Sequence, residues 1–373
     1  MLFIGSCLAL SVAAGVLNYR DDARDAAAAR ADTRLQRPLV STSGRILLLV
    51  ETAMTYDTYV VNADGTGAVR LTHSPPMPRR YPGPAVLSPD GRRMAIVRDD
   101  GISLVRIDRP GESTPLPGPG GWLAWSPDGR QLASLGIDAH KRLHLKVFDA
   151  DGSGEVRDLA TTWPSIAEGY EQYVSELIWS PDGNRFAFLL RTVIGKSARG
   201  AYNTRSDLYL APLNGSGLQN LSRENAEIGV AGDLAWSPDG KRLAFRSHRG
   251  IGTVDTELKW TDFDIQLHES RTNQRPAWSP DSRRLGWFNR FSIATSDPDG
   301  GQQQELTRGR DAGVQPAWSP DGSRLAFVCE EFRALCVMND DGSGLTRVID
   351  VRSGASVFER GAQRISFPVW LSE

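Results

Sequence analysis

Hydrophobic residues occur along this chain in short runs that alternate with polar, turn-forming segments. Five runs start with Arg or Gln and continue with mostly apolar residues: 93–97, 131–135, 185–189, 242–245 and 324–328. Runs of this length between turn formers are typical of β-strands rather than helices. The pattern therefore predicts an all-β fold built from many short strands.

A recurrent motif, Trp-Ser-Pro-Asp-Gly, precedes these runs. Copies begin at Trp125, Trp179, Trp236, Trp278 and Trp318, and a weaker copy begins at Leu87. The copy at Trp278 has Ser282 in place of the glycine. In a type I turn Pro presets φ, Ser and Asp bond nearby backbone, and Gly tolerates the exit conformation. The motif therefore predicts a strand, a tight turn and a second strand.

The motif recurs at a spacing typical of repeat proteins. Its serines lie at positions 88, 126, 180, 237, 279 and 319, and a period of about 40 to 50 residues is the signature of a propeller or a solenoid. The second half of each repeat predicts a third strand, a turn such as Asp64-Gly65-Thr66-Gly67, and a fourth strand. Four strands per repeat correspond to one propeller blade.

The two ends of the chain supply complementary parts of one more repeat. The first repeat starts near Ser43 without an opening strand, and Phe367-Pro368-Val369-Trp370 matches the opening strands at 275–278 and 315–318. Pairing these ends would avoid exposed sheet edges. We therefore expect a seven-bladed β-propeller over residues 43–373, with six blades as the alternative, closed by N- and C-terminal strands.

The N-terminal part of the sequence differs in composition from the repeats. Residues 2–17 are almost wholly apolar, so we expect residues 1–19 to be a signal peptide or a membrane anchor. Residues 20–42 are rich in Ala, Arg and Asp and are expected to form an exposed helix or a linker. A lipoprotein box ending at Cys7 and an N-terminal core helix are the alternatives. Export predicts an extracytoplasmic location in the periplasm or at the cell surface.

The charge balance and the cysteines narrow the possible functions. The 43 basic and 45 acidic residues give a net charge of −2 and are spread along the chain, so no basic stripe indicates nucleic-acid binding. Cys329 and Cys336 flank a predicted turn between neighbouring antiparallel strands. An oxidising compartment would permit a cross-strand disulfide there, and two buried thiols are the alternative.

The candidate ligand site is a ring of residues on the first strands, which line the central channel of a propeller. The position three residues before each repeated Trp is occupied by Pro84, Trp122, Glu176, Asp233, Arg275, Gln315 and Phe367. Convergent polar groups in a concavity are the usual mark of a binding site. The alternative is that these residues are solvated and bind no ligand. The repeated tryptophans themselves are expected to pack between blades.

No metal or cofactor is expected from the sequence. His140 and His144 stand four residues apart, which on a strand separates them by about 13 Å. The Asp-x-Asp-Gly turns resemble calcium loops, but a later bidentate carboxylate is missing. We therefore expect these turns to connect hairpins.

The order of the motifs resembles the repeat of TolB-like propellers, which are distant relatives of WD-type repeats. The resemblance covers residues 43–373 and implies a β-propeller of the bacterial envelope that binds partners through its faces or channel. TolB itself carries an α/β domain before a propeller usually described with six blades, and this sequence departs from both features. We therefore take the fold and the location from the resemblance, and not the Tol-Pal role. Two repeats carry apparent insertions, at residues 191–205 and 257–264.

Together these features predict a non-enzymatic, extracytoplasmic binding or scaffold protein. It would act as a monomer, engage a protein or an envelope polymer, and contact a membrane only through its N-terminal segment. The alternative is a lyase or hydrolase acting on oligosaccharides, with acid–base and carboxylate-clamping groups from Glu176, Asp233 and Arg275. The sequence contains no Gly-x-Ser-x-Gly elbow, which argues against a prolyl-oligopeptidase-type peptidase.

Overall fold

The structure, a computed structural model, describes nineteen segments of the chain: residues 44–52, 56–70, 85–90, 92–98, 101–106, 113–116, 120–138, 140–153, 156–159, 171–196, 202–222, 230–247, 250–255, 260–263, 275–289, 292–307, 313–330, 332–351 and 362–371. The predicted signal peptide or anchor at 1–19 and the spacer at 20–42 lie outside these residues. Nowhere in these segments is there a helix with the length and apolar character needed to cross a membrane.

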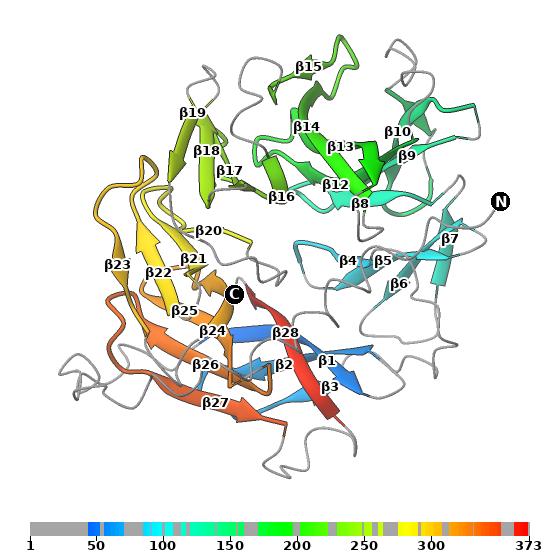
Figure 1. Cartoon of the computed structure of the whole chain (residues 1–373). Helices are drawn as coiled ribbons and strands as arrows, with labels where there is room; N and C mark the ends of the chain where they lie inside the picture. The colour runs from blue at the N-terminus through cyan, green and yellow to red at the C-terminus, as the bar shows by residue number, and fades with distance from the viewer. Residues whose placement is uncertain are drawn as a thin grey trace. The chain divides into compact units, whose positions relative to one another are not determined.

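The described strands form seven four-stranded antiparallel sheets, which are the blades of a β-propeller (Figure 1). The sheets confirm the predicted fold class and the larger of the two predicted blade numbers. The chain divides into two compact units, one made of residues 1–81 and 263–373 and the other of residues 82–262. Three blades belong to the first unit and four to the second.

The three-bladed unit contains blades one, six and seven. Blade one has the strand order β28 (Ala362–Leu371), β1 (Arg45–Thr52), β2 (Tyr56–Asn62) and β3 (Val69–Arg70). Blade six contains β20 (Ala277–Trp278), β21 (Leu285–Asn289), β22 (Ser292–Ser296) and β23 (Gln304–Glu305). Blade seven contains β24 (Gly313–Trp318), β25 (Arg324–Cys329), β26 (Ala334–Asn339) and β27 (Thr346–Asp350).

The four-bladed unit contains blades two to five, each with its strands in sequence order. Blade two contains β4 (Ala85–Leu87), β5 (Arg93–Arg98), β6 (Gly101–Arg106) and β7 (Ser113–Leu116), and blade three contains β8 (Trp122–Trp125), β9 (Gln131–Ile137), β10 (Leu143–Asp149) and β11 (Arg157–Asp158). Blade four contains β12 (Glu171–Trp179), β13 (Arg185–Lys196), β14 (Tyr202–Pro212) and β15 (Gln219–Asn220). Blade five contains β16 (Val230–Trp236), β17 (Arg242–Ser247), β18 (Ile251–Asp255) and β19 (Trp260–Phe263).

Blade one is assembled from both ends of the chain, as the sequence predicts. The C-terminal strand β28 pairs antiparallel with β1, with Ile46 opposite Trp370 and Val50 opposite Ile365. All four of these side chains are buried in one hydrophobic cluster of the three-bladed unit. The C-terminal strand therefore supplies both backbone hydrogen bonds and core to the blade.

Successive side chains of a middle strand point to opposite faces of the blade and pack against different neighbouring blades. This explains why the sequence of such a strand is almost continuously apolar. In β25, Ala326 and Val328 pack with Ile46 and Leu48 of blade one. The intervening Phe327 belongs instead to a cluster with residues of blade six, such as Ile293 and Leu306. Blade seven thus buries both faces of this middle strand, and no polar face remains there.

The repeated motif forms the turn that its residues predict. In the copy at Trp125, Ser126 Oγ donates to Asp128 Oδ1 at 2.6 Å, and Gln131 N donates to Ser126 Oγ at 2.8 Å. This hydrogen bond from Ser126 lowers the pKa of Asp128. Gly129 has a φ of 67°, and Ser282, which replaces the glycine in another copy, takes the same left-handed conformation at 61°. The turn geometry is thus kept even where a serine must adopt it.

The repeated tryptophans pack between blades, and the arginine that follows the turn contacts the tryptophan of the next blade. Arg93 Cζ lies 5.1 Å from the ring centroid of Trp125, and its Nη2 donates to Gly129 O at 2.6 Å. The Trp125 indole donates in return to Val86 O at 3.0 Å. Equivalent stacking joins Arg185 to Trp236, Arg284 to Trp318, and Arg324 to Trp370. Each contact adds a cation–π interaction to the hydrophobic contact between blades.

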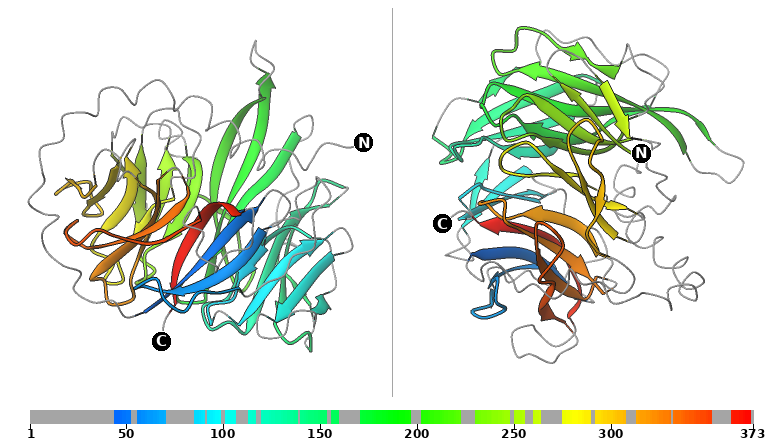
Figure 2. Two further views of the ribbon diagram at one scale, coloured as in Figure 1. Left: turned by 90° about the horizontal axis from the view of Figure 1, so that it is seen from below. Right: turned by 90° about the vertical axis from the view of Figure 1, so that its left-hand side faces the viewer.

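The described parts of the two apparent insertions lie in strands. In blade four the described parts of 191–205 continue β13 and β14, which stay paired as far as Lys196 opposite Tyr202. Figure 2 shows this green hairpin extending beyond the other strands of its blade. In blade five, residues 260–263 form β19, the regular fourth strand. Sequence length alone did not distinguish an inserted loop from a longer hairpin or from an ordinary blade strand.

Candidate functional site

Two of the predicted ring residues connect the first strands of adjacent blades. Trp122 begins β8, and its indole Nε1 donates to Val174 O of β12 at 2.8 Å. Glu176 of β12 accepts a hydrogen bond from Leu234 N of β16 at 3.0 Å. Both side chains therefore hold neighbouring first strands together in blades three, four and five.

Two other ring positions lie in β-bulges. The ladder changes register between Gly232 and Ala235 in β16 and between Val314 and Ala317 in β24. Within these bulges Asp233 and Gln315 have φ values of 60° and 58°, in the left-handed region that non-glycine residues seldom occupy. Such strain persists only where surrounding structure maintains it, and it clusters at functional sites.

The structure says less about the three remaining ring positions. Arg275 is exposed and precedes β20, whereas Phe367 lies in β28 with a side chain outside the description, and Pro84 lies outside the described residues. The structure brings Glu176 and Asp233 together around Leu234 and links Trp122 to the same group of strands. The full ring of Trp122, Glu176, Asp233, Arg275, Gln315 and Phe367 stays a prediction.

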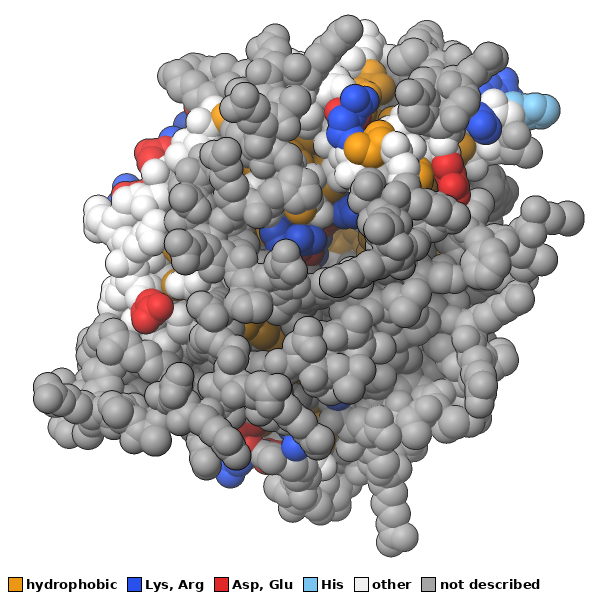
Figure 3. All heavy atoms as spheres, in the orientation of Figure 1, with side chains coloured by type: hydrophobic (Ala, Val, Ile, Leu, Met, Phe, Trp, Pro, Cys, Tyr) orange, Lys and Arg blue, Asp and Glu red, His pale blue; other side chains and the backbone are white. Residues whose placement is uncertain are grey.

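Two arginines absent from the predicted ring converge beside Asp233. Arg246 Nε donates to Asp233 Oδ2 at 2.7 Å, and Arg246 Nη2 donates to Ala231 O at 3.1 Å. Arg191 Nη2 donates to the same Ala231 oxygen at 2.7 Å, and Arg191 Nε donates to Ser175 Oγ at 3.0 Å. We call Arg191 and Arg246 the arginine pair. Figure 3 shows basic side chains beside an acidic one near the position that β16 has in Figure 1.

A signal for one of these arginines exists in the sequence. Arg246 stands five positions into its second strand, where other blades have an apolar residue: Val97, Leu135, Leu189, Phe288 or Val328. The other blades have an apolar side chain at this position, so the charged side chain of Arg246 is not what the repeat requires there. Arg191 gives no comparable signal, because its strand was interpreted as an insertion.

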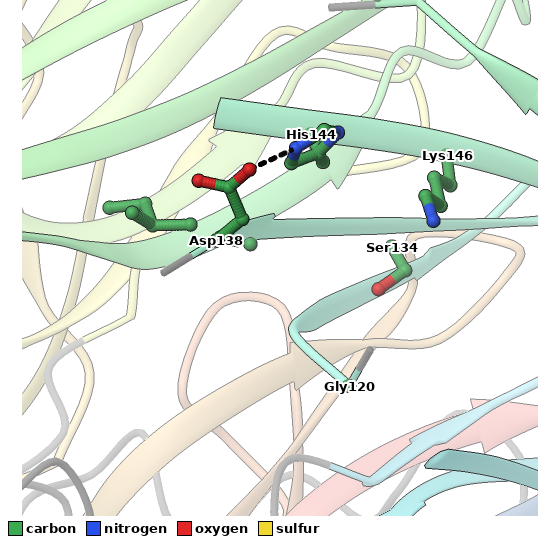
Figure 4. A pocket seen from close by; sticks show the side chains of 7 residues that line it. Gly120, Ser134, Asp138, His144 and Lys146 are labelled. Carbon is green, nitrogen blue, oxygen red and sulfur yellow. Dashed lines mark hydrogen bonds and ion pairs between the residues drawn. The ribbon is translucent and has the colours of Figure 1, made fainter. Parts of the chain in front are cut away.

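A small pocket lies on one face of blade three (Figure 4). It is lined by Gly120, Ser134, Gly136, Ile137, Asp138, His144 and Lys146. His144 Nε2 lies 3.0 Å from Asp138 Oδ2, and His144 Nδ1 lies 2.6 Å from Asp158 Oδ2. The ladder creates this cluster, since it places His144 opposite Gly136 and Lys146 between Ser134 and Asp158.

The two carboxylates define the chemistry of His144. Hydrogen bonds to Asp158 and Asp138 raise the pKa of His144 above its ordinary value. The pKa of Asp138 is lowered, mainly by the hydrogen bond from the backbone N–H of Arg142 and next by the hydrogen bond to His144. Because both ring nitrogens of His144 contact carboxylates, neither is placed to accept a proton from a serine, as a general base must. The cluster is therefore suited to holding a charged histidine rather than to nucleophilic catalysis.

Protonation of His144 links folding stability to pH. Because the pKa of His144 is raised, its contribution to stability is fully present below the ordinary value of 6.5 and is lost as pH rises through the raised value. We expect His144→Gln to reduce the free energy of unfolding by about 1 kcal/mol at about pH 5.5 and by less at about pH 8.5. Urea denaturation measures both values, with His140→Gln as the control on an exposed neighbouring histidine. A loss that is equal at both pH values would contradict the link.

The acidic turns bind their own backbone. Asp64 Oδ1 accepts from the backbone N–H and the hydroxyl of Thr66, and Asp151 Oδ1 accepts from the same two groups of Ser153. This geometry fits the hairpin role predicted for these turns. Among the residues that the structure describes, no group of three His, Cys, Asp or Glu side chains is arranged to hold a metal ion.

The cysteines of blade seven form a disulfide. Cys329 of β25 and Cys336 of β26 are bonded, with their Cα atoms 6.0 Å apart. Cys336 lies opposite Phe327 in the ladder, so the two cysteines share one face of the sheet and occupy diagonal positions. Of the two alternatives open from the sequence, the structure contains the cross-strand bond rather than the free thiols.

The fold and these clusters define a seven-bladed β-propeller with polar groups on the first strands and on the face of blade three. Similar solved structures include TolB from Acinetobacter baumannii, at 17% identity over 88% of this chain and 67% of that chain, with a TM-score of 0.44. A putative TolB from Agrobacterium tumefaciens is 20% identical over 71% of this chain and 87% of that chain, with a TM-score of 0.41. Hydrazine synthase from Kuenenia stuttgartiensis is 15% identical over 76% of this chain and 89% of that chain, with a TM-score of 0.49.

The likeness to TolB-like propellers that the repeats indicate is thus also found among solved structures. An enzyme appears beside them, and identities and TM-scores this low transfer no activity to this chain. No protein-family model matches the sequence, and no curated protein is significantly similar to it. The chemistry of this chain's own residues therefore carries the function.

Proposed function

We propose that this protein is a non-enzymatic, extracytoplasmic binding protein that engages a protein partner through blade four. The observation that carries the proposal is the length of β13 and β14, with 12 and 11 residues. The second and third strands of the other blades have five to eight residues. We call residues 171–173, 191–196 and 202–206 the extended sheet, because they lie beyond the length that the repeat requires.

The extended sheet has features suited to partner binding. The side chain of Ile194 is 59% exposed, one of the few large apolar side chains so exposed among the described residues. The strand β15 pairs with Tyr209 and Leu210 of β14, so among the described strands residues 204–206 have a neighbour only in β13. A sheet edge offers backbone hydrogen bonds to an added strand, and an apolar side chain beside it adds contact area.

The location outside the cytoplasm rests on two features. The Cys329–Cys336 bond is favoured in oxidising compartments and is rare in the cytosol. The apolar segment at residues 2–17 predicts export on independent grounds. An envelope polymer in place of a protein is the alternative ligand.

The alternative function, an oligosaccharide lyase or hydrolase, receives less support from the geometry. Glu176 already accepts a backbone hydrogen bond from Leu234, and Asp233 already binds Arg246. General acid–base chemistry needs a group within reach of a substrate proton, whereas these carboxylates contact the protein. An oligosaccharide-cleaving activity lost in Glu176→Gln and Asp233→Asn, but retained in Arg347→Gln, would favour the enzyme.

The test of the proposed function is quantitative crosslinking of envelope fractions to the whole protein and its variants. Ile194→Asp should reduce the specific partner signal by about tenfold, because a charge in an apolar contact is desolvated without a counter-charge. Val69→Asp is the matched control, since Val69 is 53% exposed on β3. A partner that crosslinks equally to both variants would exclude the extended sheet as its binding surface.

A second variant separates binding from local folding. Joining Arg191 to Ser206 through Asn-Gly, a favoured two-residue hairpin turn, removes the tip and gives β13 and β14 the length of other blades. We expect this short-hairpin variant to fold and to lose the same partner as Ile194→Asp. Retention of the partner would contradict the proposal.

A further inference from the structure

We propose that Arg191 and Arg246 form a carboxylate-binding site that receives an acidic segment of a partner protein. That the partner is a protein rests on the proposed function. The carboxylate site rests on its own geometry. Both arginines lie in the four-bladed unit, on β13 and β17.

The two guanidinium groups are fixed side by side. Each donates from Nη2 to the single oxygen of Ala231, at 2.7 Å and 3.1 Å. Each is also held through Nε, by Ser175 Oγ for Arg191 and by Asp233 Oδ2 for Arg246. No described residue accepts a hydrogen bond from either Nη1, so within the described part of the chain both can donate to a ligand. Two paired donors at fixed positions suit the two oxygens of a carboxylate.

The backbone of β16 is shaped to bring the arginines together. A Cβ on Gly232 would lie 3.3 Å from Arg191 Nη2 and 3.4 Å from Arg246 Nη2, so a side chain there would crowd both groups. Gly232 has a φ of 136° and Asp233 a φ of 60°. The bulge at these residues interrupts the ladder, and Ala231 O accepts arginines instead. Gln315 has the same left-handed conformation in the bulge of β24, so the bulge alone is a feature of more than one blade. The two arginines bonded to Ala231 O are what point to a function in β16.

The two arginines of the pair differ in their charged partners. Asp233 is the counter-ion of Arg246, at 2.7 Å. Arg191 is half-buried and bonded to two neutral groups, the Ser175 hydroxyl and the Ala231 carbonyl. Among the described residues it therefore has no carboxylate partner, and a partly buried cation without one attracts an anionic ligand.

The neighbourhood favours a peptide over a small anion. Arg191 lies opposite Tyr173 and Ser206 at the base of the extended sheet, and exposed Ile194 lies on the same strand. A segment that paired with this sheet could place an acidic side chain on the arginine pair and an apolar one near Ile194. Strand addition of this kind combines backbone hydrogen bonds with side-chain pockets.

The test measures binding of a tetraglutamate peptide by titration calorimetry at low salt, with tetraglutamine as the uncharged probe. We expect saturable binding of tetraglutamate only, weakened about tenfold or more in Arg191→Gln and in Arg246→Gln. Arg347→Gln is the matched control, because Arg347 is an exposed arginine of blade seven paired with Glu330. No binding of tetraglutamate to the wild type, or equal binding by all variants, would overturn the proposal.

Three further measurements keep the outcomes distinct. Arg191→Lys and Arg246→Lys retain the charge but lose the planar guanidinium with its several N–H donors. Each variant should therefore bind tetraglutamate more weakly than wild type, even if a Gln variant unfolds. The short-hairpin variant retains Arg191, so it should bind tetraglutamate while losing the partner. Tighter binding of trigalacturonate than of tetraglutamate would assign the site to an acidic polysaccharide and overturn the peptide assignment.

Discussion

Deleting residues 362–373 is expected to abolish cooperative unfolding of the three-bladed unit. The deletion removes β28, which pairs with β1 along most of its length. It also removes Ile365 and Trp370 from the largest cluster of that unit. A blade that loses its first strand exposes both a hydrophobic face and a row of unpaired backbone groups. The expected loss therefore exceeds the typical net stability of a domain, about 5–15 kcal/mol.

Much of this effect comes from one side chain. Trp370 Nε1 donates to Ala317 O at 3.1 Å, and Arg324 Cζ lies 4.5 Å from the Trp370 ring centroid. Burial lowers the pKa of Arg324, so the ring faces a cation that has little contact with water. Trp370→Ala should cost about 3–5 kcal/mol through lost contacts and the cavity left behind.

The measurement is thermal unfolding followed by near-ultraviolet circular dichroism and calorimetry. Val369→Ser is the matched control on the same strand, because Val369 is 48% exposed and exposed substitutions change stability by about 0.5 kcal/mol or less. If the truncated chain melted like the intact one, β28 would not be part of the folded unit.

The fold was predictable because it depends on short-range chemistry repeated many times. Ser126, Asp128 and Gly129 are enough to specify their turn, and the bond from the serine hydroxyl to the aspartate recurs in all six copies of the motif. The match between Phe367–Trp370 and the other first strands fixed the composition of blade one. Each of these inferences needed only the local sequence and its repetition.

The candidate sites were less predictable because they depend on register. His144 meets Asp138 and Asp158 only through the pairing of β9, β10 and β11, and spacing along one strand does not reveal cross-strand neighbours. The conformation of Asp233 depends on a bulge that no residue type specifies. Trp122 and Glu176 were correctly placed on first strands, but the bonds that they make between blades could not be read from the sequence.

The extended sheet and the arginine pair share one origin. Both arise where blades four and five depart from the repeat, through longer strands in the first case and through the charged Arg246 at an otherwise apolar position in the second. Six copies of a motif define what the fold requires, so departures from it identify residues retained for another reason. The repeat itself is therefore the reference against which these residues stand out.

The second large effect concerns the disulfide of blade seven. Breaking the Cys329–Cys336 bond is expected to lower the free energy of unfolding by about 2.5 kcal/mol, because the unfolded chain then regains the freedom of the small closed loop. The two cysteines are seven positions apart. Both are buried, at 1% and 6% exposure, so the bond should resist reduction in the folded protein.

Urea denaturation with and without a strong reductant measures this contribution. The wild type should lose about 2.5 kcal/mol in reductant, whereas the double variant Cys329→Ala, Cys336→Ala should be equally stable in both conditions. Cys→Ala is preferred to Cys→Ser because a buried hydroxyl would add a desolvation cost. Alkylation of the protein denatured directly from whole cells should leave the peptide with both cysteines unmodified until it is reduced. Rapid alkylation of both thiols would instead place the protein in a reducing compartment, and the proposed location would be wrong.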